Sequence, residues 1–236
     1  MKIRIKFAKE GTMKFIGHLD IMRYFQKVMR KADVDIRYSE GFSPHQIMSF
    51  AAPLGVGTTS RGEYVDIEVL STDSSKEMVR RMNEAVVEGI EILSFRRLPD
   101  TAANAMSIVA AADYRVAFRE GKEPKDWDSF AAALQELMDQ KEILVLKKTK
   151  KGEKETDIRP MIHELRAEEK TVFMRIATGS AANLKPDVVI QAAFDRMGQA
   201  LEPFALLVHR EEVYASRQED GVQKLVPLEW FGEEIE

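Results

Sequence analysis

The residues best able to do chemistry are gathered between Lys9 and Glu68 of this 236-residue chain. Two of the four histidines, His18 and His45, lie there beside glycines, a proline and several cations. A histidine side chain can contact a phosphate or transfer a proton near neutral pH. The candidate binding residues are Lys14, His18, Asp20, Arg23, Ser43 and His45. The sequence assigns a catalytic role to none of them.

His18 belongs to a Gly-His-Leu-Asp tetrad at the expected start of a helix. Gly17 can adopt backbone conformations that are closed to other residues. His18 and Asp20 are two positions apart, so on a helix they point in different directions and do not pair with each other. Two interpretations stay open for His18. It contacts a phosphate or acts as an acid or base with a partner from elsewhere, or it packs at the junction of strand and helix.

His45 ends a compact loop over residues 39–45, in which a glycine and a proline restrict the backbone. This loop is either a binding element or an ordinary turn. The sequence does not determine whether His45 and His18 converge in space. If they do, together with Arg23 or Lys14, the site would suit an anionic ligand.

The chain contains no cysteine. This excludes disulfides, thiolate nucleophiles, cysteine-ligated zinc and ordinary cysteine-held iron–sulfur clusters. The glycine-containing segment 53–60 is neither a phosphate-binding P-loop nor a dinucleotide fingerprint. No Ser-His-Asp triad, HExxH motif or catalytic pair of carboxylates is identifiable. We predict no metal and no cofactor, and whether the protein is an enzyme stays open.

The charge is unevenly distributed along the chain. Residues 1–62 hold eleven Lys or Arg and five Asp or Glu, a net +6, which leaves −10 for the remainder. A basic segment in an acidic protein is compatible with a phosphate or nucleic-acid contact, and equally with an ordinary solvated face. No apolar run approaches the roughly 20 residues of a membrane span. We therefore expect a cytoplasmic location and no membrane contact.

Hydrophobic periodicity predicts the elements that position these residues. In the first half they follow the order strand, helix, strand, strand, helix, strand. The expected elements are a strand at 2–8, a helix at about 18–32, a short extended piece at 33–38, a strand at 63–70, a helix ending near 87 and a strand at 90–98. Ser74 and Glu77 are spaced as a capping box for the second helix.

The second half repeats this order. Its expected elements are strands at 114–118, 142–148, 157–165, 171–177 and 204–210, helices at 126–140 and 185–198, and a charged hairpin at 148–155. The sequence therefore predicts an α+β fold of two tandem ferredoxin-like (βαββαβ) units with antiparallel sheets. We expect a first unit at 1–100, a linker at 101–112 and a second unit at 113–236, with the tail from 211 packing onto the second unit. The alternative is a single α+β domain with one long mixed sheet.

Four motifs carry a family resemblance: KEGTMKFIGHLDIMR, YSEGFSPHQIMSF, PLGVG and GEYVDIE, all within residues 9–68. They resemble the radical SAM-linked proteins of bacteria, a family of unknown function. A further match is DIRPMI at 157–162, and one departure is Gln46, where the family often has proline. The resemblance implies a protein encoded beside, or fused to, a radical SAM protein. It implies no particular activity.

Three functions are compatible with these observations. The first is an accessory protein that presents RNA or a translation-related substrate to a partner radical SAM enzyme. The second is a protein–protein adaptor that binds no nucleic acid. The third is an enzyme of unassigned class that uses His18 and His45. For the first of them, the outward lysines and arginines of the strand at 2–8 predict mainly phosphate-directed contacts with RNA.

Overall fold

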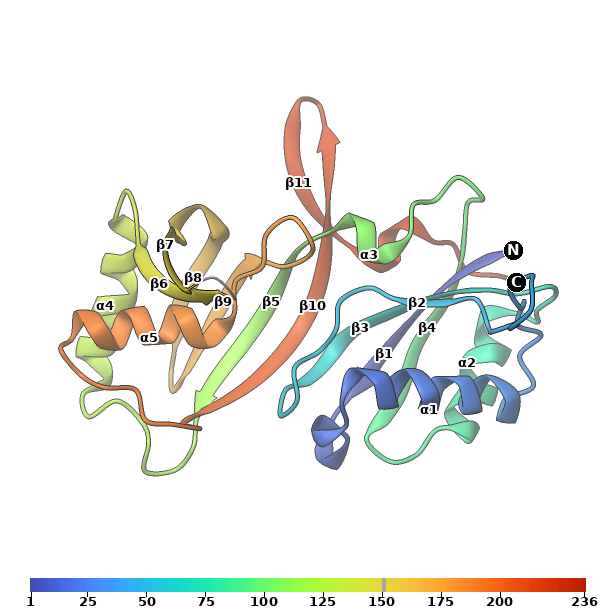
Figure 1. The fold of residues 1–236 in the computed structure, drawn as a ribbon, viewed down its shortest axis with the longest axis horizontal. Helices are drawn as coiled ribbons and strands as arrows, with labels where there is room; N and C mark the ends of the chain where they lie inside the picture. Colours follow the sequence, from blue (N-terminus) through green and yellow to red (C-terminus); the bar gives the residue numbers. More distant parts are fainter. Residues whose placement is uncertain (150–151) are drawn as a thin grey trace. The chain divides into compact units, whose positions relative to one another are not determined.

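The computed structural model describes residues 1–149 and 152–236, so the tip of the predicted charged hairpin lies outside the described residues. The chain forms two compact units. The first unit contains Met1–Ala110 and Glu212–Glu236, and the second contains Ala111–Glu211 (Figure 1). Both combine helices with mostly antiparallel strands, which confirms the α+β class.

The sheet of the first unit is built around its N-terminal strand. Its strands are β1 (Lys2–Lys9), β2 (Met48–Phe50), β3 (Thr59–Glu68) and β4 (Ile90–Leu98). β1 pairs antiparallel with β3 on one side and with β4 on the other, and β2 pairs antiparallel with β3. β3 also has β10 (Leu206–Glu219) as a hydrogen-bonded neighbour, and β11 (Val222–Pro227) pairs with β10.

Two helices cover one face of this sheet, α1 (His18–Lys31) and α2 (Ser75–Ala85) (Figure 1). The alternating residues Ile3, Ile5 and Phe7 of β1 point into the core beneath them and are fully buried. One half of the predicted capping box is present, because Ser74 Oγ accepts a hydrogen bond from the Glu77 amide at 3.3 Å. The Glu77 carboxylate binds Arg80. α1 buries Ile21, Phe25, Val28 and Met29 against the sheet, whereas Leu19 in its first turn is exposed.

Most of the expected linker at 101–112 is regular secondary structure, from residue 105 onward. Ala105–Ile108 form a short helix, α3, and β5 (Val109–Phe118) begins five residues before the strand predicted at 114. Ala111 and Ala112 are fully buried in β5. Small side chains gave no periodic signal here, although they pack closely once neighbouring strands supply the other side of the contact.

The second unit carries α4 (Trp127–Asp139), β6 (Leu144–Thr149), β7 (Gly152–Asp157), β8 (Ile162–Glu168), β9 (Thr171–Ala177) and α5 (Pro186–Arg196). Its strands are ordered β10-β5-β9-β8. β6 pairs only with β7, in a separate two-stranded hairpin. The strand predicted at 142–148 is therefore not a member of the main sheet. The strand predicted at 157–165 begins later, after the 3₁₀ turn Arg159–Met161.

The tail from Glu212 belongs to the first unit, not to the second as expected. It contains the end of β10, β11 and the 3₁₀ helix η3 (Leu228–Phe231). Glu233 exchanges backbone hydrogen bonds with Arg97 of β4, and the Ile235 amide donates to Ser75 Oγ at 2.8 Å. These are long-range pairings, which local periodicity does not encode. None of the helices in the described residues is long and apolar enough to cross a membrane.

Candidate functional site

His18 stands at the start of α1, directly after the 3₁₀ helix η1 (Gly11–Phe15). Its ring meets the ring of Phe50 edge to face, with the two centroids 5.5 Å apart and the planes at 89°. Beside it is a cavity of about 10 Å³, room for about one water molecule. The cavity is lined by Phe7, Lys9, His18, Ile21, Phe50, Ala52, Leu54 and Glu63.

Two charged side chains of opposite sign line the same cavity and are almost inaccessible to solvent. Lys9 is 2% exposed and Glu63 is 5% exposed. Lys9 Nζ donates a hydrogen bond to the Ile16 carbonyl at 2.7 Å. Burying a charged side chain costs free energy unless it is paired or hydrogen-bonded. Lys9 and Glu63 therefore form a buried polar site next to the GHLD motif. His18 lines the same cavity beside them.

Sequence reasoning missed Lys9 and Glu63, although both leave a readable signal. Lys9 has the same parity as Ile3, Ile5 and Phe7 of β1, and Glu63 has the same parity as Val65 and Ile67 of β3. Each is therefore a charge on the inward face of an otherwise apolar alternation. Such a break in the pattern predicts either the end of the core or a buried polar site.

His45 lies in the exposed loop and does not contact the cavity residues. Its Nδ1 is 2.9 Å from Ser39 Oγ, and its backbone amide donates to the same oxygen at 3.1 Å. The Ser43 carbonyl lies 3.4 Å from Nδ1. These contacts close the loop upon itself, so His45 and Ser43 have a structural part in holding its shape.

His18 begins α1, whereas the loop of His45 contacts α1 farther along the helix. Gln46, next to His45, donates from Nε2 to the Gln26 carbonyl at 3.3 Å. Gln26 follows His18 by eight residues, which is about 12 Å along a helix. The structure therefore does not bring His18 and His45 into one site.

Three further candidates lie near the start of α1. Lys14 is in η1, with Nζ 5.2 Å from the centroid of the Phe15 ring. Asp20 and Arg23 form an ion pair at 3.4 Å in which both side chains are largely exposed. Such pairs contribute little to stability. Arg23 is therefore free to exchange Asp20 for another anion.

The cations on the outer face of β1 are not exposed, contrary to the prediction. Arg4 is 1% exposed and binds Asp66 through two hydrogen bonds, at 2.7 and 2.9 Å. Arg4 also donates to the Leu228 carbonyl at 3.0 Å, and Lys2 Nζ donates to the Asp100 and Ala102 carbonyls. The segments 100–105 and 212–231 cover this face of the sheet and neutralise it. RNA phosphates therefore cannot reach it.

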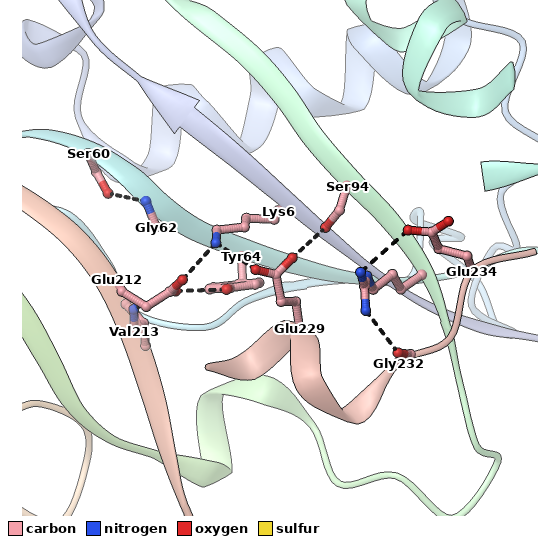
Figure 2. Close-up of polar contacts among 11 residues, drawn as sticks. Lys6, Ser60, Gly62, Tyr64, Ser94, Glu212, Val213, Glu229, Gly232 and Glu234 are labelled. Atoms are coloured by element: carbon pink, nitrogen blue, oxygen red, sulfur yellow. Dashed lines mark hydrogen bonds and ion pairs between the residues drawn. The ribbon is translucent and has the colours of Figure 1, made fainter. Parts of the chain in front are cut away.

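Figure 2 shows the polar cluster around Lys6 on this covered face. Lys6 Nζ lies 2.6 Å from Glu212 Oε2 and 2.7 Å from Glu229 Oε1, while the Tyr64 hydroxyl donates to Glu212 Oε1 at 2.7 Å. Burial alone would lower the pKa of Lys6, but the two carboxylates outweigh it and raise that pKa. Burial and the charge of Glu212 also raise the pKa of Tyr64. Lys6 therefore serves to fasten the tail.

Cations do remain exposed along one side of α1. Arg23, Lys27 and Arg30 fall within about 60° around the helix axis at 3.6 residues per turn. Lys27 and Arg30 make no hydrogen bond or ion pair with any other residue that the structure describes. Two aromatic rings of the same segment are also exposed, Phe15 of η1 and Phe42 of the loop over residues 39–45. We call the following residues the motif surface: Lys14, Phe15, Arg23, Lys27, Arg30 and Phe42.

The described residues contain no group of three or more histidine, cysteine, aspartate or glutamate side chains arranged to hold a metal ion.

Comparisons with known proteins identify the chain only at the level of family. No curated protein sequence matches it. A chain of the solved structure "Crystal Structure of a Cbf5-Nop10-Gar1 Complex" matches with a TM-score of 0.45 and 10% sequence identity, covering 89% of this chain and 48% of that one. The present chain thus spans about half the length of that protein. A family model matches residues 2–186, which include the GHLD motif, the loop of His45 and DIRPMI. The chain belongs to the family described as "Uncharacterized protein conserved in bacteria (DUF2344)".

Proposed function

We propose that this protein is an accessory protein that holds RNA for a partner radical SAM enzyme, and that the motif surface makes the RNA contact. The partner rests on the sequence resemblance of residues 9–68. We also propose that both units are ferredoxin-like. In chain order, β1 to β4 of the first unit are arranged fourth, first, third, second, and so are β5, β8, β9 and β10 around the second unit, as in a βαββαβ unit. This count leaves out the hairpin of β6 and β7 and the tail strands of the first unit.

The observation that carries the proposal is which cations of residues 1–62 are bound within the fold and which are not. Those of β1 are bound within the fold, as described above. Arg37 and Arg61 pair with acidic side chains, and Lys31 Nζ donates to the Ala85 carbonyl. Lys14, Lys27 and Arg30 remain without a carboxylate partner among the described residues. Cations left uncompensated on one helix face are suited to phosphate groups, whose contacts position a nucleic acid.

The test is RNA binding by the double variant Lys27→Gln/Arg30→Gln, measured by fluorescence anisotropy between about 50 and 200 mM salt. Loss of two phosphate contacts should weaken binding and reduce the slope of log K against log[salt] by about 1.4 for a single strand. The matched control is Lys76→Gln, an exposed cation of α2. An unchanged affinity and slope in the double variant would remove the motif surface as the RNA contact.

The partner is tested separately, by recovery of the tagged protein from its native cell extract with and without ribonuclease. A radical SAM protein recovered together with RNA supports the proposal. Recovery of neither contradicts it.

The second candidate function is an adaptor that contacts only protein. It is favoured by two exposed aliphatic side chains near the motif surface, Leu19 at 67% and Val56 at 66% exposed. Val56 is close to η1, because the neighbouring Gly57 amide donates to the Lys14 carbonyl at 2.8 Å. An adaptor would retain its partner after ribonuclease treatment, lose it on Leu19→Gln and bind no RNA.

A further inference from the structure

We infer, on the basis of the proposed function, that the RNA is bound as an unpaired strand whose bases stack on Phe42 and Phe15. Phe42 is fully exposed and Phe15 is 63% exposed. A phenylalanine left in water forgoes about 1.5–3 kcal/mol of burial. Their position outside the core leaves both rings available to a ligand.

Hydrogen bonds within the loop that carries Phe42 restrict its backbone, so the position of the Phe42 ring is restricted as well. The Ser39 amide donates to the His45 carbonyl at 2.8 Å, and Ser39 Oγ accepts from the His45 amide. Gly41 has φ of +114°, a left-handed conformation that favours glycine next to Phe42. A ring presented on an ordered loop loses little conformational entropy when it binds a base.

Phe15 lies before the cationic row in the chain, close to the start of α1. It ends η1, three residues before the first residue of α1, and the Lys14 ammonium lies 5.2 Å from its ring centroid. The base of the Phe42 loop reaches α1 at Gln26, between Arg23 and Lys27. Phe15 therefore precedes α1 by a short stretch of chain, and the loop that carries Phe42 is hydrogen-bonded to α1 at its base.

The acidic groups nearest to this row do not cancel its charge. Asp20 is paired with Arg23, and Glu40 lies 3.9 Å from Arg37. The motif surface thus retains Lys14, Lys27 and Arg30 as uncompensated cations among the described residues.

The combination of rings and cations distinguishes a single strand from a duplex. In an A-form duplex the base faces are stacked on each other, and proteins contact the 2′-hydroxyls and phosphates across the minor groove. An unpaired strand offers both its base faces and its phosphates, which rings and cations bind respectively. Cations alone would serve either form of RNA, so it is the exposed rings that select the unpaired strand.

The experiment compares an oligouridine of about 12 nucleotides with a duplex of the same length, a size within the range of single-strand sites. We expect tighter binding of the single strand. Phe42→Ala and Phe15→Ala should each weaken single-strand binding by about 5- to 100-fold, with the salt slope unchanged because no charge is lost. Duplex binding should not change. Phe42→Trp should retain single-strand binding, whereas Phe42→Leu should not.

The control variant is Phe204→Ala, which removes another largely exposed phenylalanine, in the second unit. Melting curves establish that each variant is folded, as expected for side chains outside the core. Equal binding of single strand and duplex, with Lys27→Gln/Arg30→Gln still weakened, would overturn the stacking inference and leave the proposed function standing. Binding of neither RNA would overturn both. Loss of a protein partner on Phe42→Ala without loss of RNA would identify a protein-docking surface and overturn the inference.

Discussion

The buried ion pair between Arg4 and Asp66 gives the sharpest test of whether the cations of β1 are neutralised within the first unit. In the variant Asp66→Asn, Arg4 keeps its charge and its buried position but loses its anionic partner. Arg4 is 1% exposed, and Asp66 is 13% exposed by side chain. The lost contacts are two charge-assisted hydrogen bonds of 2.7 and 2.9 Å.

Removing one member of a buried ion pair costs about 3–5 kcal/mol of unfolding free energy. We expect the lower end, about 3 kcal/mol, because the amide oxygen of the introduced asparagine can still accept a hydrogen bond from the Ala105 amide, as Asp66 does at 2.8 Å. Arg4 also keeps its bond to the Leu228 carbonyl. The matched control is Asp20→Asn, the same chemical change in the exposed pair with Arg23, which should cost below about 0.5 kcal/mol.

The assay is urea denaturation followed by tryptophan fluorescence. The chain has two tryptophans, Trp127 and Trp230, one in each unit. In a Trp127→Phe background, the remaining Trp230 lies in η3, two residues after Leu228. Its fluorescence therefore reports unfolding of the unit that contains Arg4, whether or not the second unit unfolds at the same urea concentration.

A double-mutant cycle with Arg4→Met isolates the pair itself. The double variant should be less destabilised than the sum of the two single variants, because removing both charges leaves neither one buried alone. A cost of Asp66→Asn no larger than that of Asp20→Asn would refute the reasoning. It would mean that Arg4 is accessible to solvent, and the outer face of β1 would again be a candidate for phosphate binding.

Three further predictions concern single positions. Gly89→Ala should lower the unfolding free energy by more than about 2 kcal/mol, since φ of Gly89 is +89° and an added Cβ would lie 2.8 Å from the Glu10 carbonyl. The control is Gly11→Ala, where φ is +54° and an added Cβ meets open space, which should cost about 1 kcal/mol in the same denaturation assay. Lys9→Met should destabilise the first unit, because Lys9 is buried and bonded to a backbone carbonyl; an unchanged urea midpoint would show that its charge has no structural part. Hydrogen bonds from Ser129 lower the pKa of the helix cap Asp126 from its ordinary 3.8, so the stability that this cap contributes is present above pH 3.8 and lost as pH falls through its folded value. Asp126→Ala should accordingly be less stable than wild type at neutral pH, with the difference narrowing in acid.

The elements with a strong local signal could be predicted from the sequence alone. The alternation of Ile3, Ile5 and Phe7 predicted β1, and the cap formed by Ser74 was correct. The helices α1, α4 and α5 and the strand β9 lie within the predicted ranges or match them. In each case the pattern repeats over neighbouring residues, so a single element contains the information that determines it.

The candidate site was predicted only in part. His18, Lys14 and Arg23 lie together near the start of α1, but His45 and Ser43 lie in a separate loop whose contacts are local. Lys9 was missed because it lies one residue beyond the strand predicted at 2–8, and Glu63 because it was taken as the first residue of the strand predicted at 63–70. Their burial depends on α1 and on the segment around Phe50, which are distant from them in sequence.

The sequence by itself determined the α+β class, the long helices, the absence of thiol chemistry and the positive charge of residues 1–62. Only the tertiary structure decided where that charge is available. The tail from Glu212 returns to the first unit and, with residues 100–105, covers Lys2, Arg4 and Lys6. Lys27 and Arg30 stay exposed on α1. Periodicity records which side of an element is polar, whereas solvent access depends on which distant segment packs against that side.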